Sequence, residues 1–423
     1  MNLTAEQQEI LDGKKGEFPA KCMKLLVDWG RGMGARRLIP IEQSMPTSYT
    51  SVPGQGHPLK SHPELVKKYI KFISEFLEYE TKCPAASHIA RFDLTNPDIM
   101  KIDAETVAAQ EKLKEMGSDA GINMTWSCAP YLQGHVPMPG QICAWTESHA
   151  VIFINSFLNA RSTRNGGDTA LAAGITGWIP EFGTLTDEGR KKADLIIDVK
   201  EIPVNDMEWG LLGYWAGKHA AINTPAFIGL EKSRPRLEAA RQMCAGLATS
   251  GGSTILHIVG VTHEAPTLDT LKFPKGNPEV FVYDGKEKAA LLKQYGAVKG
   301  QEIDIVHFGC PHASLQEIIE ISKIVRGKKK HPGTTLLIST NFGVLSMAKR
   351  NGFAKIIEDF GGILMSDTCP LQAPGLDTFK EWKCMATSNV KQAHYIRAIF
   401  GTNSVLGDTE KCLNSAITGV WEG

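Results

Sequence analysis

Hydrophobic residues recur at three- and four-residue steps in several stretches of the chain, which is the pattern of amphipathic helices. Between residues 62 and 80, apolar side chains with this spacing stand opposite lysines and glutamates: Leu65, Val66, Tyr69, Ile70, Ile73, Phe76 and Leu77. We expect a helix whose apolar face packs on the body of the protein. Residues 105–117 form a second helical run, which ends at a glycine.

Strands and helices are predicted to alternate in the second half of the chain. The helical run 237–252 ends at paired glycines, and 253–262 is a continuous apolar stretch rich in β-branched residues, which is typical of a strand buried on both faces. We then expect strand 303–308, helix 314–325, strand 334–340, helices within 344–362 and strand 363–366. This alternation favours an α/β fold with a parallel sheet flanked by helices.

The length of the chain argues for more than one lobe. A chain of 423 residues is too long for one ordinary hydrophobic core, so we expect two or three lobes with a cleft between them. We predict an N-terminal lobe at 1–235 and a C-terminal α/β lobe at 236–423.

Composition narrows the partners and the compartment. The 46 basic residues balance the 46 acidic ones, so charge gives no reason to expect a nucleic acid or an anionic membrane as partner. No stretch resembles a signal peptide or approaches the roughly 20 apolar residues of a membrane span. The nine cysteines are an odd number without a CxxC pair, which argues against a secreted disulfide framework. We expect a cytoplasmic protein that binds small molecules or other protein chains.

Polar residues and cysteines follow the predicted strands. In parallel sheets, ligands bind beyond the carboxyl ends of the strands. The residues at these ends are 262–264, 309–312, 339–341 and 367–370, and two of the four ends carry a cysteine followed by proline, Cys310 and Cys369. A single cysteine is most often a small buried apolar residue.

A central stretch, residues 125–180, is dense in groups that a buried site could use. They are Cys128, Glu147, Ser148, Asn155, Ser156, Arg161, Arg164 and Asn165. Such residues often only cap helices and form turns. Several nevertheless lie in or beside apolar segments such as "AVIFINSFL", where a buried polar group must pair with the protein, a ligand or a metal.

The cysteines and this central stretch lie in motifs that resemble the aconitase X family, in particular its separate large subunit. The matching segments, in order, are "LTNP", "TWSCAPYL", "AWTESHAVIFINSFLNARSTRNGG", "ITGWIPEFG", "GCPHASLQEI", "SDTCP" and "TSNVKQAHY". The resemblance implies a multi-lobed, aconitase-like α/β architecture with parallel sheets and an active site in the cleft between lobes. Family members are hydro-lyases that use iron, as a [2Fe-2S] cluster, a [4Fe-4S] cluster or a mononuclear ion. Their substrates include cis-3-hydroxy-L-proline and 5-phosphomevalonate.

The resemblance also implies roles for individual residues. It assigns iron ligation to Cys128, Cys310 and Cys369, and substrate contacts to Asn96, Pro97, Glu147, Ser148 and Lys391. Three thiolates leave one coordination position for substrate, where iron could draw charge from a departing hydroxyl oxygen. The other six cysteines are expected to be packing residues: Cys22, Cys83, Cys143, Cys244, Cys384 and Cys412.

Removal of a proton next to a carboxylate needs a base and a cation that holds the developing charge. We predict that Ser388, Lys391, Glu147 and His312 form the catalytic set. His312 and His394 could carry protons, or could simply be hydrogen-bonded within the protein. The predicted substrate-binding residues are Pro46, Thr47, Ser48, Asn96, Pro97, Ser148, Asn155, Ser156, Arg161 and Asn165.

The chain departs from the family pattern at residues 43–45, at His149 and at 396–398, which adds the cation of Arg397. All three departures fall in segments that face substrate in the family, so they bear on substrate identity. Family enzymes also need a small swivelling domain that closes over the cleft. Because the chain ends with a capping helix and tail at Gly423, we expect that domain to be a separate small subunit.

Three alternatives remain open. A phosphorylated substrate would want several cations, which Arg161, Arg164, Lys391 and Arg397 could supply. Dinucleotide-dependent oxidoreduction is disfavoured, because the glycines in "GLATSGGSTILHIVG" precede the expected strand instead of following it. A non-catalytic zinc protein would need a fourth ligand beside the three thiols, and His312 is the candidate.

Overall fold

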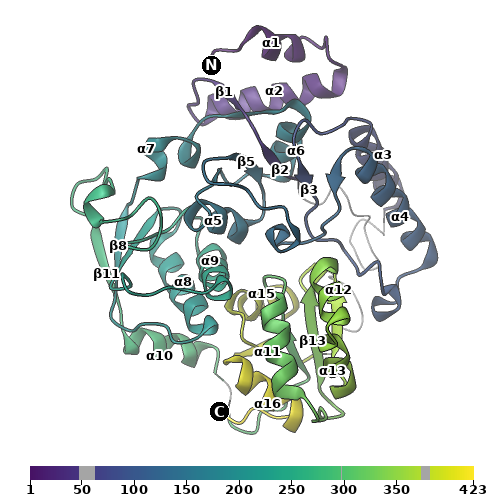
Figure 1. Ribbon diagram of the computed structural model, residues 1–423, viewed down its shortest axis with the longest axis vertical. Coiled ribbons are helices and arrows are strands. Elements are labelled where there is room, and N and C mark those ends of the chain that lie inside the picture. Colours follow the sequence, from purple (N-terminus) through teal and green to yellow (C-terminus); the bar gives the residue numbers. More distant parts are fainter. Residues whose placement is uncertain (47–61, 297, 373–381) are drawn as a thin grey trace.

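The computed structural model describes residues 1–46, 62–296, 298–372 and 382–423. Its elements form three units that follow one another along the chain and surround a common centre (Figure 1). The first unit lies at the top and right of this view, the second at the left and the third at the lower right.

The first unit contains a five-stranded parallel sheet of order β4-β3-β2-β5-β6 and an antiparallel pair, β1-β7. Its strands are β1 (Leu38–Pro40), β2 (Gln43–Met45), β3 (Ala85–Ala86), β4 (Ile122–Asn123), β5 (Ile142–Trp145), β6 (Arg161–Ser162) and β7 (Trp178–Pro180). Its helices are α1 (Ala5–Leu11), α2 (Glu17–Gly32), α3 (Pro63–Leu77), η2 (Pro97–Met100), α4 (Ala104–Asp119), η3 (Pro130–Gln133), α5 (Ser148–Ser156), α6 (Gly167–Thr176), η4 (Gly183–Leu185) and α7 (Asp187–Arg190).

The second unit is built on a four-stranded parallel sheet of order β10-β9-β8-β11. Its elements are β8 (Leu195–Val199), α8 (Asp206–Ala220), β9 (Pro225–Ile228), α9 (Leu237–Ser250), β10 (His257–Ile258), η5 (Leu268–Thr270), β11 (Glu279–Tyr283) and α10 (Gly285–Gln294). Strands from both sides of residue 235 pair in this sheet, so residue 235 lies inside the second unit. The division of the chain into lobes 1–235 and 236–423 stays a prediction.

The third unit has a five-stranded parallel sheet of order β14-β13-β12-β15-β16. Its elements are β12 (Ile305–Phe308), α11 (Leu315–Val325), β13 (Thr335–Thr340), α12 (Phe342–Arg350), α13 (Phe353–Phe360), β14 (Ile363–Ser366), β15 (Cys384–Thr387), α15 (Val390–Phe400), β16 (Asn403–Leu406) and α16 (Thr409–Thr418). This is the alternation of buried strands and amphipathic helices that the sequence predicts, and the α/β class is confirmed.

Helix α3 confirms the prediction for residues 62–80, although it ends at Leu77. Its apolar face is only partly covered, because Ile73 and Phe76 are buried while Leu65 remains exposed. The predicted strand at 253–262 is wrong in length, since only His257 and Ile258 pair in the sheet. The residues on either side lie in loops. For example, the Leu256 N–H donates to the Ser156 hydroxyl oxygen at 3.0 Å instead of to a neighbouring strand.

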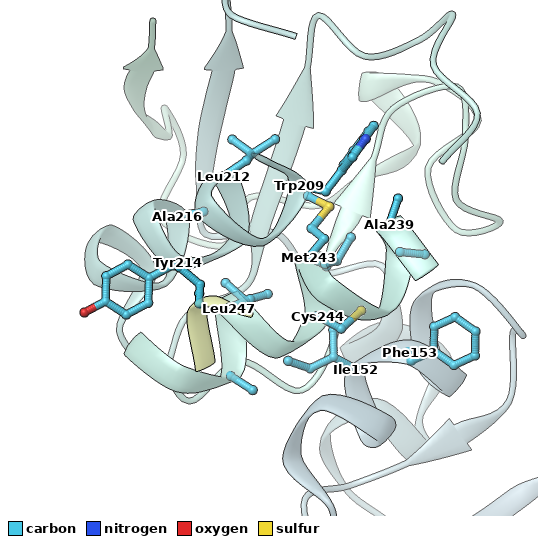
Figure 2. Packing of buried hydrophobic residues seen from close by; sticks show 14 of the residues in the cluster. Ile152, Phe153, Trp209, Leu212, Tyr214, Ala216, Ala239, Met243, Cys244 and Leu247 are labelled. Atoms are coloured by element: carbon cyan, nitrogen blue, oxygen red, sulfur yellow. The ribbon is translucent and has the colours of Figure 1, made fainter. Parts of the chain in front are cut away.

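Helices α8 and α9 pack so closely that their backbones touch (Figure 2). A Cβ atom on Gly213 would lie 2.1 Å from the Met243 carbonyl oxygen, and one on Gly246 would lie 2.1 Å from the Gly210 carbonyl oxygen. The other face of α9 packs on α5, where Cys244 lies close to Ile152 (Figure 2). Glycine thus brings α9 to the centre of the molecule, between the first and third units.

Among the residues that the structure describes, no helix has the length and apolar character required to cross a bilayer.

The close packing of α8 on α9 gives a stability prediction. We expect Gly246→Ala to lower the free energy of unfolding by about 2 kcal/mol or more, because the added methyl group meets backbone atoms that cannot rotate away. Gly32→Ala in α2 is the matched control, since open space surrounds that position and alanine favours a helix. Urea unfolding followed by circular dichroism measures both. Equal stability of Gly246→Ala and the wild type would contradict the packing described here.

Candidate functional site

Two of the three candidate cysteines follow strands of the third sheet. Cys310 comes two residues after β12, and Cys369 comes three residues after β14. Gly309 precedes Cys310 with a φ of +104°, and a Cβ atom there would lie 1.9 Å from the Ser339 carbonyl oxygen. Only glycine fits this turn, because the neighbouring strand β13 leaves no room for a side chain.

The Asn389 side chain holds the same turn from the opposite side. Its Oδ1 accepts the backbone N–H of Gly309 at 3.1 Å and that of Cys310 at 3.2 Å. Asn389 lies just before α15, between Ser388 and the first turn that carries Lys391. The serine–lysine segment and the Cys310 turn are therefore fixed to each other by one buried amide.

The third candidate cysteine, Cys128, reaches this region from the first unit. It precedes η3, and its Sγ accepts the backbone N–H of His312 at 3.3 Å. Burial raises the pKa of the Cys128 thiol to about 12 and that of Cys369 to about 11, and it also raises the pKa of Cys310. Cys369 raises the pKa of Cys128, and Cys369 and Cys128 both raise the pKa of Cys310, so the three thiols share one environment.

The three thiols fit iron or an iron–sulfur cluster by the chemistry of their donor atoms, because such groups are held by cysteine thiolates. The positive charge of a bound metal would offset the cost that burial imposes on each thiolate. Over residues 1–46, 62–296, 298–372 and 382–423, no three His, Cys, Asp or Glu side chains already stand close enough together to hold one ion. The donor set is gathered from three loops rather than from one compact group of side chains.

Glu147 is the centre of the charged cluster beside these thiols. It lies at the N-terminus of α5, and Oε1 accepts from Lys391 Nζ at 2.7 Å and from His149 Nδ1 at 2.9 Å. Its Oε2 accepts from His88 Nε2 at 2.8 Å. The Ser148 hydroxyl also donates to Oε1, at 3.3 Å. Both oxygens of the carboxylate are thus engaged by donors from separate segments.

The Glu147–Lys391 pair is ionised. Burial alone would raise the pKa of Glu147, but Lys391 and the two histidines hold it well below its usual range. Burial alone would lower the pKa of Lys391, but Glu147 and the neighbouring Cys310 raise it above its usual range. The lowered pKa of Glu147 and the raised pKa of Lys391 both favour the charged forms. A carboxylate and an ammonium therefore lie side by side, with side-chain exposures of 13% for Glu147 and 15% for Lys391.

His149 links this cluster to the aromatic core. Burial lowers its pKa to about 4, so the imidazole is neutral at physiological pH. Because a carboxylate only accepts hydrogen bonds, the proton lies on Nδ1, and Nε2 faces the Tyr131 hydroxyl at 3.5 Å.

His312 is bonded within the protein through both ring nitrogens. Nε2 donates to the Thr368 carbonyl oxygen at 3.1 Å, so Nδ1 accepts from the Ser127 hydroxyl at 3.2 Å. Burial lowers the pKa of His312 to about 3. This matches the alternative of a hydrogen-bonded structural histidine, and a catalytic or ligating role for His312 stays a prediction. His394 is also hydrogen-bonded within the protein, with Nδ1 at 3.0 Å from the Tyr214 hydroxyl.

Ser388 faces a cavity of about 700 Å³ between the second and third units. The cavity is lined by the start of α8, the loop before α9, the end of β12 and the start of α16, and both Ser388 and Asn389 contribute to its wall. Of the catalytic residues predicted from the sequence, Glu147 and Lys391 are in contact, and Ser388 lies on the same segment as Lys391. His312 contacts Cys128 through its backbone N–H.

Several predicted substrate-binding residues make contacts within the protein. Asn155 bonds the backbones of Ser162 and Thr254, and Ser156 accepts from the Leu256 N–H. Asn165 donates to the carbonyl oxygens of Trp145 and Thr163. These side chains fix the loop after α5, and their predicted contact with substrate stays a prediction.

The remaining predicted residues lie around the edge of the first unit. Pro46 is buried directly after β2, while Thr47 and Ser48 fall outside the described residues. Asn96 is exposed and Pro97 begins η2. Asp93 fixes this loop, because its carboxylate accepts the backbone N–H groups of Asn96 and, across the units, Ser366.

The four cations that could hold a phosphate are dispersed. Arg161 pairs with Asp187 at 2.6 Å, and Arg164 is exposed. Arg397 donates to backbone carbonyl oxygens, including that of Gln294 at 3.0 Å. Of these four, Lys391 is the one that contacts Glu147 among the residues described.

Sequence reasoning missed His88 as a partner of Glu147. His88 follows β3 by two residues, so the rule on strand ends could have identified it in the first sheet as it did Cys310 in the third. The roles of Asp93, Asn389 and Arg241 were also missed, because each acts through backbone groups that are distant in sequence.

The domains found by comparison with known proteins follow the three units of the fold. Models of the first, second and third domains of aconitase X match residues 1–188, 193–293 and 303–418. The phosphomevalonate dehydratase large subunit of Methanocaldococcus jannaschii is 31% identical over 98% of this chain and 99% of its own length. The one from Thermococcus kodakarensis is 32% identical over 98% of this chain and 100% of its own length.

Relatives with another substrate are also similar. The cis-3-hydroxy-L-proline dehydratase of Pseudomonas aeruginosa is 27% identical over 99% of this chain and 70% of its own length. The crystal structure of Thermococcus kodakaraensis aconitase X in its holo-form matches with a TM-score of 0.83 at 29% identity, covering 98% of this chain and 100% of that one.

The Glu147 cluster generates a pH prediction. The pKa of Glu147 is below 4.5 in the folded state, so the carboxylate stabilises the fold above that pH and loses this contribution as pH falls through the lowered folded pKa. We expect Glu147→Gln to cost about 3 kcal/mol of unfolding free energy at pH 7, and the difference from wild type to shrink below pH 4.5.

Glu181→Gln is the control for this measurement, because Glu181 pairs with the exposed Arg37 and should cost less than about 1 kcal/mol. Denaturant unfolding between about pH 3 and pH 7 compares the variants. A constant difference between Glu147→Gln and wild type over this range would show that the carboxylate does not titrate as described.

Proposed function

The chain belongs to the aconitase X family and is a hydro-lyase, and on this premise we propose that it is the large subunit of an iron-dependent dehydratase of a small hydroxy acid. One observation carries the proposal. Lys391 and the buried Glu147 form an ion pair in the same environment as the thiols of Cys128, Cys310 and Cys369.

In this proposal the three cysteines hold iron or an iron–sulfur cluster. The bound group supplies a Lewis acid for the departing hydroxyl oxygen. Asn389 keeps the Cys310 turn in place through two backbone hydrogen bonds, which supports a preorganised thiol.

The chain's own residues handle the proton and the developing charge. We propose that Lys391, whose raised pKa keeps it an ammonium, binds the substrate carboxylate and stabilises negative charge as the neighbouring C–H bond breaks. Ser388, three residues before Lys391, is the proposed base: as the alkoxide, its oxygen accepts that proton and becomes the hydroxyl. Loss of the proton and of hydroxide yields the unsaturated acid and one water molecule.

The charge distribution favours an unphosphorylated substrate, and cis-3-hydroxy-L-proline is the first candidate. A phosphate is usually held by more than one cation. Of the four candidate cations, Lys391 is the one in contact with Glu147 among the described residues. Arg161 pairs with Asp187, and Arg397 donates to backbone carbonyl oxygens, so neither is placed beside Lys391 to share a phosphate.

A second candidate, 5-phosphomevalonate, is supported by a different observation. The phosphomevalonate dehydratase large subunits align with this chain over 99% and 100% of their own length, whereas the hydroxyproline enzyme aligns over 70% of its length. The same relatives, named as large subunits, support a separate small subunit that completes the site. We also propose a cytoplasmic location, because all nine cysteines are free thiols.

The test is anaerobic purification of the chain together with its small subunit, followed by metal analysis and assay of both substrates. Formation of an unsaturated product from either acid, with iron bound, is the expected result. Zinc at one equivalent without iron, and no dehydration of either acid, would instead support the alternative of a non-catalytic zinc protein.

A pair of cysteine variants tests the ligand assignment. Cys310→Ala should lose iron and activity together, because it removes one of the three proposed thiolate ligands. Cys244→Ala is the matched control, since Cys244 is also buried but packs in the hydrophobic core around α9 (Figure 2). It should keep both iron and activity. Full iron content in Cys310→Ala would rule out Cys310 as a ligand.

A further inference from the structure

Helix α9 contributes one buried guanidinium, that of Arg241, to the region between the loops that carry Cys128 and Cys310. Arg241 is 1% exposed and belongs to the second unit, whereas the two cysteine loops belong to the first and third units. All three of its guanidinium nitrogens donate hydrogen bonds to groups of these other units.

One branch of these contacts leads to the thiols. Arg241 Nη2 donates to the backbone carbonyl oxygen of His312, two residues after Cys310. The N–H of the same His312 donates to Cys128 Sγ at 3.3 Å. Because the carbonyl and N–H of His312 are both held, the guanidinium fixes how the Cys310 loop meets the Cys128 thiol.

A second branch leads to the carboxylate. Arg241 Nε donates to the Tyr131 hydroxyl oxygen at 3.1 Å, so the hydroxyl proton is available for His149 Nε2 at 3.5 Å. His149 then donates from Nδ1 to Glu147. In this series of hydrogen bonds, from Arg241 through Tyr131 and His149, each donor points toward Glu147. The carboxylate therefore only accepts, and the series sets the tautomer of His149.

The geometry requires an arginine rather than a generic cation. The planar guanidinium spans the Tyr131 hydroxyl, the His312 carbonyl and the Glu317 carboxylate, which it meets at 3.3 Å. A lysine ammonium is a point charge that cannot reach all three in fixed directions. Glu317 also belongs to the capping box that begins α11, so the counter-charge itself is held in place.

We propose that Arg241 is a positioning residue that assembles the two halves of the site, the Cys128–Cys310 loops and the Tyr131–His149–Glu147 chain, in one register. The inference rests on the proposed function for its catalytic meaning. Its structural content concerns this chain alone and can be measured in the metal-free protein.

The test compares Arg241→Lys with Arg190→Lys. Arg190 is also 1% exposed and donates to main-chain carbonyl oxygens, those of Asn155 and Ala160, but it pairs with Glu264 and touches neither cysteine loop. The two variants therefore disturb the protein in similar ways at different places. Iodoacetamide alkylation of the folded, metal-free chain, followed by peptide mass spectrometry, reports the accessibility of each thiol.

We expect Arg241→Lys to raise the alkylation rate of Cys128 and Cys310 by about tenfold or more, because opening of the loops then breaks fewer charged hydrogen bonds than in the wild type. Arg190→Lys should leave both rates within about twofold of wild type. In the iron-containing enzyme, Arg241→Lys should also lower kcat more than it raises KM, since the hydrogen bonds from Tyr131 through His149 to Glu147 lose their fixed geometry.

Equal acceleration of alkylation in both variants, or none in Arg241→Lys, would overturn the proposal and leave Arg241 a packing residue. If Arg241→Lys fails to fold, Arg241→Gln against Arg190→Gln applies the same criterion, since glutamine keeps a polar side chain of helix-forming character but lacks the charged, branched guanidinium. Failure of the positioning role and failure of the proposed function give different results. A difference in alkylation without dehydration of any substrate would retain the positioning role and reject the proposed function.

Discussion

The structure depends on a carboxylate that is buried where three units of the chain meet. Removing a charged group from water is costly unless other groups replace its hydration. Glu147 is stabilised by Lys391 from the third unit and by His88 and His149 from the first. His149 lies on α5, which begins directly after Glu147, whereas Lys391 and His88 come from other segments. The requirement to satisfy one anion therefore constrains α5, α15 and the end of β3 together.

The second unit takes part through α9. Glycines on α8 and α9 allow the two helices to touch, and α9 in turn carries Arg241 to the loops of the other two units. Buried charges of both signs thus lie at the centre, with the thiols beside them. An arrangement of this kind is preorganised, because its hydrogen bonds and ion pairs are made on folding and already fix the positions of the charged side chains.

The sequence predicted the parts of the fold in which local pattern and tertiary packing agree. Helix α3 and the third sheet follow hydrophobic periodicity, and the rule on strand ends was enough to single out Cys310 and Cys369. The apolar run 253–262 misled, because its backbone pairs with side chains and turns for most of its length. Contacts such as that of Arg241 with the His312 carbonyl could not be predicted, since periodicity carries no information about which distant backbone group a buried side chain meets.

The proposed dehydration of a hydroxy acid depends on a charged side chain, Lys391, that lies beside the three thiols. The decisive measurement is the dehydration rate of the Lys391→Met enzyme at the same iron content as the wild type, with the small subunit present in both. We predict that iron is retained and that kcat falls by at least about 100-fold, because the ammonium that stabilises the developing charge is gone. Equal rates for Lys391→Met and wild type would contradict this mechanism.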